Sequence, residues 1–162
     1  LDAVRLRSDV ERKRARGIEA TSREGARGAL YAPAARDAVY ARVAALAQRL
    51  LGWGRSVVVD ASFLDAAQRH AFAALAEAAG ASFAVVDVRA PEAVLRARVA
   101  VRAAAGTDAS DADLAVLDAQ LRAYRPPGDD EAARTLRWDA TAAPTREAVS
   151  TAWRAHLAGR AA

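Results

Sequence analysis

The sequence contains no cysteine and, among its 24 basic residues, only one lysine, Lys13. Without cysteine the chain has neither disulfides nor thiolate chemistry, which fits a reducing compartment. No apolar run approaches the roughly 20 residues that a membrane-spanning helix needs. We therefore expect a cytoplasmic location and no membrane partner.

Several motifs of common catalytic centres are also absent. The sequence has no G-x-S-x-G, no G-x-G-x-x-G and no cluster of metal-ligand residues, and His70 and His156 have no partner at ligand spacing. The formal net charge is +4 and the pI about 10.3. Because arginine replaces lysine almost throughout and alanine is abundant, we first interpret this charge as a compositional bias.

Short apolar runs alternate with longer helical patterns, which is typical of a parallel sheet covered by helices. The clearest strand is Ser56–Asp60, whose three consecutive valines predict a strand buried on both faces. Further strands are predicted at 3–6, 83–88 and 135–139. The 162 residues are the usual size of one domain, and we predict a single α/β domain.

Helices are predicted from 33 to 51, 65 to 79, 91 to 105 and 144 to 157. A further helix is predicted to begin at Ser110, with Asp113 three residues later in an arrangement like a capping box. Residues 10–28 are predicted to form a loop or a mobile helix pair. In the helix from 33, apolar residues recur at helical spacing and predict the buried face. They are Val39, Val43, Leu46, Leu50 and Leu51.

Two acids follow predicted strands, Asp9 after the first and Asp60 after the second. Ligands of open α/β sheets bind outside the carboxyl ends of the strands. Two acids at neighbouring strand ends suit phosphoryl transfer, one accepting a hydroxyl proton and the other holding Mg²⁺ through water. In the alternative, Asp9 caps a helix and Asp60 merely ends a strand.

An arginine cluster lies on the helix from 91. Arg98 and Arg102 are four residues apart and share a face, and Arg96 precedes them. Followed by the Gly106 loop, they could form a lid over a triphosphate at about 96–110. The alternative is a solvated helix face.

A basic run from Arg5 to Arg16 lies beside Asp9. Arg7, Arg12 and Tyr31 are our candidates for contact with the acceptor substrate. The main alternative function is a non-enzymatic module that uses residues 5–16 to bind nucleic acid or another polyanion. The remaining alternative is an exposed charged segment without a ligand.

Four stretches, taken in order, resemble a family of bacterial P-loop kinase-like proteins often described as AAA-family ATPases. They are residues 4–14, 31–33, 56–63 and 89–98. The resemblance implies a three-layer α/β/α P-loop NTPase fold that binds ATP and Mg²⁺ and phosphorylates a hydroxyl of an unidentified acceptor. Many such domains follow an aminoglycoside-phosphotransferase-like domain, so an upstream fused domain is an expected partner.

The resemblance also implies roles for particular residues. Asp9 matches the general base and Asp60 the Walker-B-like acid near Mg²⁺. Arg98 and Arg102 match lid arginines, with Arg96 beside them, and Asp139 falls in the region near the adenine.

The sequence departs from this family because it has no G-x-x-x-x-G-K-[ST] loop. The resemblance begins at the family's second strand, so we expect residues 1–162 to be an N-terminally incomplete domain, inactive and unstable alone. The absent strand would lie between 56–60 and 83–88. We expect there either an empty slot of roughly 9–10 Å, twice the usual strand spacing, or a strained direct pairing.

Overall fold

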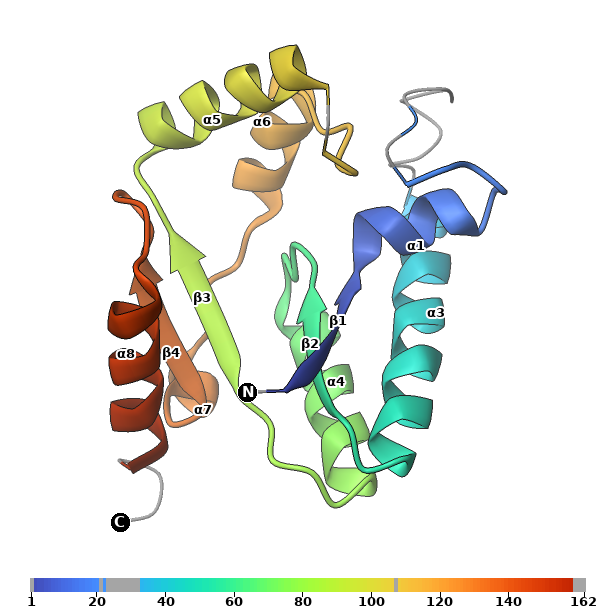
Figure 1. Cartoon of the computed structure of the whole chain (residues 1–162), viewed down its shortest axis with the longest axis vertical. Coiled ribbons are helices and arrows are strands. Elements are labelled where there is room, and N and C mark those ends of the chain that lie inside the picture. Colours follow the sequence, from blue (N-terminus) through green and yellow to red (C-terminus); the bar gives the residue numbers. More distant parts are fainter. Residues whose placement is uncertain (1, 21, 23–32, 107, 159–162) are drawn as a thin grey trace.

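The computed structural model describes residues 2–20, 22, 33–106 and 108–158. Within them, strands and helices alternate along the chain, as the sequence predicted (Figure 1). No helix in these ranges is long and apolar enough to cross a membrane.

The first group of elements is built around a pair of parallel strands. The strands are in register from Ala3 opposite Ser56 to Arg7 opposite Asp60. Helices α1 and α3 lie beside this pair, and α4 packs against α3 (Figure 1). The elements are β1 (Ala3–Arg7), α1 (Ser8–Arg14), α3 (Pro33–Gly52), β2 (Ser56–Asp60) and α4 (Ala66–Ala78).

The hydrophobic core belongs to this group. Its buried residues are contributed by β1, α3 and α4, and Val57 and Val59 of β2 pack against them. Four of the five residues predicted for the stripe on α3 belong to this core or pack against it, Ala47 is added to them, and Leu51 is not among them. The buried residues are Leu6, Val39, Val43, Ala47 and Phe72.

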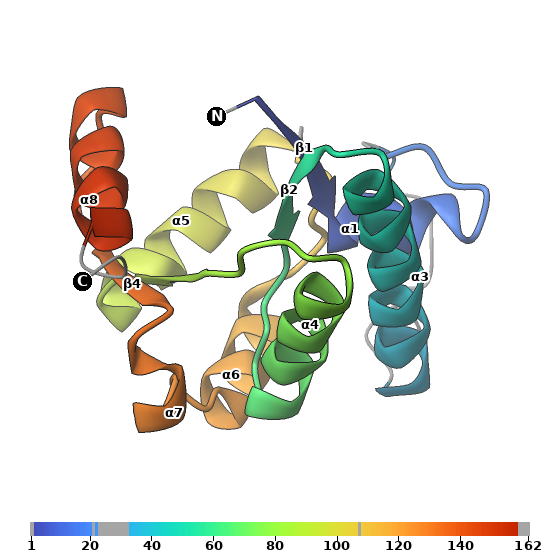
Figure 2. The same cartoon turned by 90° about the horizontal axis from the view of Figure 1, so that it is seen from below.

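The second group is also built around two parallel strands, in register from Val85 opposite Thr135 to Arg89 opposite Asp139. Helix α8 packs beside β4, while α5 and α6 lie together beyond the strand ends (Figures 1 and 2). The elements are β3 (Val85–Arg89), α5 (Glu92–Ala105), α6 (Leu114–Ala123), α7 (Asp129–Ala132), β4 (Thr135–Asp139) and α8 (Arg146–Ala158).

The two strand pairs are separate sheets, ordered β1-β2 and β3-β4. Among the described residues, β2 and β3 each have a strand neighbour on one side only. The predicted burial of β2 on both faces is wrong, because Val58 is 50% exposed and no described element covers its side of the strand. On β3, Val86 is 49% and Val88 61% exposed. Within the described ranges, the valine-rich strands β2 and β3 therefore each have one unpaired edge and exposed valine side chains.

Two local predictions also need correction. Of the loop or helix pair predicted for residues 10–28, the described part begins with a regular helix, α1, that spans Ser8–Arg14 and so starts before residue 10, directly after β1. Ser110 is not an N-cap: α6 begins at Leu114, and Asp113 is its N-cap, accepting a hydrogen bond from the backbone N of Val116. Residues 108–113 form a loop, from which Asp108 contacts Arg7 and Asp111 contacts Lys13.

A buried ion pair joins the two groups. Arg69 on α4 and Glu131 on α7 are 3% and 2% exposed, and two hydrogen bonds of 2.7 Å connect them. Arg69 also donates to the backbone oxygens of Phe63 and Arg125, each at 3.0 Å. The hydrogen bonds from Arg69 hold the pKa of Glu131 below its ordinary value.

We predict that Arg69→Met lowers the free energy of unfolding by about 3–5 kcal/mol, because Glu131 is left buried and charged without a partner. Urea denaturation measures the loss. Removing both charges, in Arg69→Met with Glu131→Leu, should restore most of it. Arg36→Ala, in the exposed pair with Asp37, should cost no more than about 1 kcal/mol. A loss below about 1 kcal/mol for Arg69→Met would contradict the role of this pair.

Candidate functional site

The candidate site lies at the carboxyl ends of β1 and β2. All four strands point toward the side of the molecule where α5 and α6 lie (Figure 1). Asp60 is the last residue of β2, and Asp9 lies in the first turn of α1, two residues after β1 ends. The N-cap of α1 is Arg7, so Asp9 does not cap this helix. The structure therefore places both acids at neighbouring strand ends.

Arginines accompany both acids. Arg5 donates to Asp60 at 2.5 Å, and the Nε of Arg7 lies 3.4 Å from the same carboxylate. Asp9 forms an ion pair with Arg12, one turn further along α1. Asp9 also contributes to the electrostatic environment of Arg7. One guanidinium, that of Arg7, thus lies among the candidate catalytic carboxylates.

A third acid reaches Arg7 from the loop after α5. The Nη2 of Arg7 lies 3.0 Å and 3.3 Å from the two carboxylate oxygens of Asp108. Burial acts to raise the pKa of Asp108, but hydrogen bonds from the backbone N of Ser110 and from Arg7 hold this pKa below its ordinary value. No local sequence pattern marked Asp108, because its partner is 101 residues away.

Lys13 makes a second connection to the same loop. Its ammonium lies 3.1 Å from Asp111 and donates to the backbone oxygens of Ala20 and Ser22 at 3.1 Å and 2.7 Å. Its three N–H donors therefore have three partners, and the side chain is buried. Lys13 joins α1, the following segment and loop 108–113.

The three lid candidates have different surroundings. Arg98 donates to the backbone oxygen of Thr141 at 3.2 Å, which brings α5 to the loop after β4. Arg102 lies near Asp108. Arg96 pairs with Glu92 and with Asp118 of α6, so it joins two helices.

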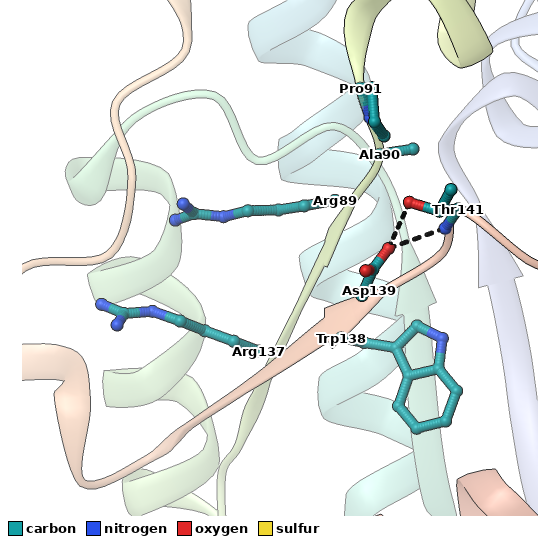
Figure 3. Close-up of a pocket in the computed structure, with 7 residues that line it drawn as sticks. All are labelled: Arg89, Ala90, Pro91, Arg137, Trp138, Asp139 and Thr141. Atoms are coloured by element: carbon teal, nitrogen blue, oxygen red, sulfur yellow. Dashed lines mark hydrogen bonds between the residues drawn. The ribbon is translucent and has the colours of Figure 1, made fainter.

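An open depression of about 440 Å³ lies at the ends of β3 and β4 (Figure 3). Asp139 and Thr141 both line it, and the backbone N and hydroxyl of Thr141 donate to one carboxylate oxygen of Asp139 at 2.8 Å and 2.5 Å. These two hydrogen bonds lower the pKa of Asp139. The lining residues are Arg89, Ala90, Pro91, Arg137, Trp138, Asp139 and Thr141.

The loop after Asp60 is held in a conformation that L-residues rarely adopt. Phe63 has φ +42°, in the left-handed region. The hydroxyl of Tyr40 accepts from the backbone N of Phe63 at 2.9 Å, and Arg69 binds its carbonyl. The rings of Tyr40, Phe63 and Phe72 pack edge to face at 5.1–6.4 Å. Tyr40 and Phe72 lie on two different helices, so no local pattern in the sequence linked them to this loop.

The candidate Tyr31 lies outside the described residues. Away from the site, His70, Asp130 and Glu131 offer ligand atoms within 4.8 Å of one another. Both oxygens of Glu131 are already bound by Arg69, so the trio does not form an available metal centre.

Parallel strands, covering helices and acids at the strand ends make this an α/β domain whose architecture is consistent with a P-loop NTPase. The chain matches the model of the AAA domain family over residues 1–127 and belongs to that family. The resemblance stated from the sequence is confirmed. No curated protein and no solved structure matches the chain.

We predict that Asp108 contributes about 1 kcal/mol to stability at neutral pH. Its pKa is lowered in the folded state, so this contribution is present above the unfolded pKa, near 3.8, and is lost as pH falls through the lower folded pKa. Urea denaturation measures the free energy of unfolding of Asp108→Asn and of the parent from pH 7 to pH 2. The two free energies should differ at pH 7 and become equal in acid. The exposed Asp129→Asn is the control, and a difference that persists at pH 2 would contradict the prediction.

Proposed function

We propose that this chain is part of an ATP-dependent kinase that transfers a phosphoryl group to a hydroxyl of an acceptor molecule. The observation that carries the proposal is the placement of Asp9 and Asp60 at the ends of paired parallel strands in a P-loop NTPase family domain. Phosphoryl transfer depends mainly on positioning and on stabilising charge, for which acids and arginines at one sheet edge are suited.

Asp9 is proposed as the general base and Arg12 as the side chain that positions it. The acceptor oxygen attacks the γ-phosphorus, the bond from this phosphorus to the β–γ bridging oxygen breaks, and ADP leaves. Asp9 takes the hydroxyl proton. Arg7, next to Asp9, is proposed to contact the acceptor.

Asp60 is proposed to hold Mg²⁺ through water. Its carboxylate is partly exposed and offers the hard oxygen ligand that Mg²⁺ prefers, so the residue fits the ion. Bound Mg²⁺ would neutralise charge on the phosphates. Arg5 and Arg7 now balance the charge of Asp60, and its loop is fixed by Tyr40 and Arg69.

The nucleotide is proposed to lie between α5 and the ends of β3 and β4. Arg98 already contacts the loop at Thr141 from α5, and Arg102 lies on the same helix. Arg98 and Arg102 would stabilise phosphate charge, while Arg96 would support the lid through its bridge to α6. Asp139 and the depression beside it would contact the base.

We further propose that a strand–loop–helix unit outside residues 1–162 completes the domain. Its strand would pair with the open edges of β2 and β3, giving one five-stranded parallel sheet, and its loop would bind the phosphates. Its helix would cover valines that are now exposed, such as Val58 on β2 and Val86 and Val88 on β3. Without this unit the chain is proposed to be inactive. Such a kinase would act in the cytoplasm, where ATP is available.

We predict that appending a β-strand, a G-x-x-x-x-G-K-[ST] loop and a helix before Leu1 confers Mg²⁺-dependent ATP binding and raises the melting temperature. The gain in stability is expected because strand edges become paired and the valines become covered. Calorimetric titration with ATP and thermal unfolding measure the two effects.

Two controls make this test specific. The same extension with the loop lysine changed to alanine should keep the gain in melting temperature but lose ATP affinity. Asp60→Asn in the extended chain should weaken the Mg²⁺ dependence by about tenfold or more. An extended chain that is more stable but binds no ATP would overturn the proposed kinase function.

A further inference from the structure

The basic segment beside Asp9 is matched by carboxylates almost one to one. Five cations lie between residues 5 and 14, and each forms an ion pair. Their five acidic partners come from β2, α1 and the loop after α5. The cations are Arg5, Arg7, Arg12, Lys13 and Arg14, and the acids are Asp9, Glu11, Asp60, Asp108 and Asp111.

Two of the five cations are largely buried. The side chains of Lys13 and Arg12 are 3% and 11% exposed, whereas those of Arg5 and Arg14 are 61% and 63% exposed. Glu11 is fully buried and pairs through its two oxygens with Arg14 and with Arg42 of α3. A polyanion approaching this face therefore meets arginines whose charge is already offset.

Two of these acids, Asp108 and Asp111 from loop 108–113, determine how much positive charge the basic segment presents. The Nη2 of Arg7 donates to both oxygens of Asp108, so an anionic group of a ligand would compete with this carboxylate for the same donor. Asp111 neutralises Lys13. An acceptor carrying phosphate would have to displace Asp108 from Arg7, whereas an uncharged hydroxyl can donate a hydrogen bond to a carboxylate already in place.

We propose that the acceptor is an uncharged molecule bearing hydroxyl groups, such as a polyol or sugar, and not a nucleic acid or a phosphorylated compound. This inference rests on the proposed kinase function. Loop 108–113 then acts as the part of the site that determines specificity, because its carboxylates cancel the positive charge that would attract anionic acceptors.

The first experiment measures binding of a fluorescent single-stranded DNA of 20 nucleotides to the 162-residue chain. Asp108→Asn with Asp111→Asn should bind at least about tenfold more tightly than the parent and show a steeper dependence on salt, because two carboxylates that offset the positive charge of this face are removed. Glu77→Gln with Asp129→Asn changes two exposed acids elsewhere and alters the net charge equally. This control should bind as weakly as the parent.

Asp108→Asn alone provides a second variant, because Asp111 neutralises the buried Lys13 and its loss could prevent folding. The increase in DNA affinity of Asp108→Asn over the parent should be about half of that of the double variant, compared as logarithms of the affinity. A parent chain that already binds the DNA as tightly as the variants, with the same salt dependence, would overturn the inference.

The second experiment uses the extended chain described above and follows ADP release with sugars, polyols and their phosphorylated forms. Turnover of the uncharged compounds only is expected, with Asp108→Asn shifting the preference toward phosphorylated ones. If ATP binds but the parent prefers phosphorylated acceptors, the inference on the acceptor is wrong. If ATP does not bind at all, the proposed kinase function fails instead, and the DNA-binding result then decides the charge argument.

Discussion

Of the ion pairs that connect the two groups of elements, the one between Arg69 and Glu131 is the most deeply buried. The two parallel strand pairs share no ladder in the described part of the chain, so other contacts must place them relative to each other. Arg69 binds Glu131 and two backbone carbonyls, and the backbone N of Arg125 donates to Leu64 at 2.7 Å. Thr135, which opens β4, donates to the carbonyl of Glu131. These links connect the loop after Asp60 to the start of β4.

The same links bear on the candidate site. The loop after Asp60 contains a left-handed Phe63, a conformation that costs of order 1–3 kcal/mol and persists only when its surroundings hold it. Tyr40 accepts from the backbone N–H of Phe63 and Arg69 donates to its carbonyl, so the loop that follows Asp60 is held both by the aromatic core and by the residue of the buried ion pair. The stability of the domain and the geometry of its proposed metal ligand therefore have a common origin.

Periodicity in the sequence predicted the elements that depend on local rules. The valine run of β2, the apolar stripe of α3 and the acids after β1 and β2 all lie where alternation and strand-end rules placed them. The exposure of Val58 was not predictable, because burial depends on which element covers a strand. The roles of Asp108 and Glu131 were not predictable for a related reason. Asp108 pairs with Arg7, 101 residues away, and Glu131 with Arg69, 62 residues away, and no spacing rule connects such positions.

Lys13 carries the only side-chain amine in these 162 residues, and it is buried with three oxygen partners. Acetylation, ubiquitin attachment and amine-reactive crosslinkers all need an accessible lysine nitrogen that can lose its proton. None of the other 23 basic residues offers one, because the arginine guanidinium stays protonated. Lysine-specific modification of residues 1–162 is therefore blocked while the chain is folded. A modified Lys13 would show that α1 and loop 108–113 have separated.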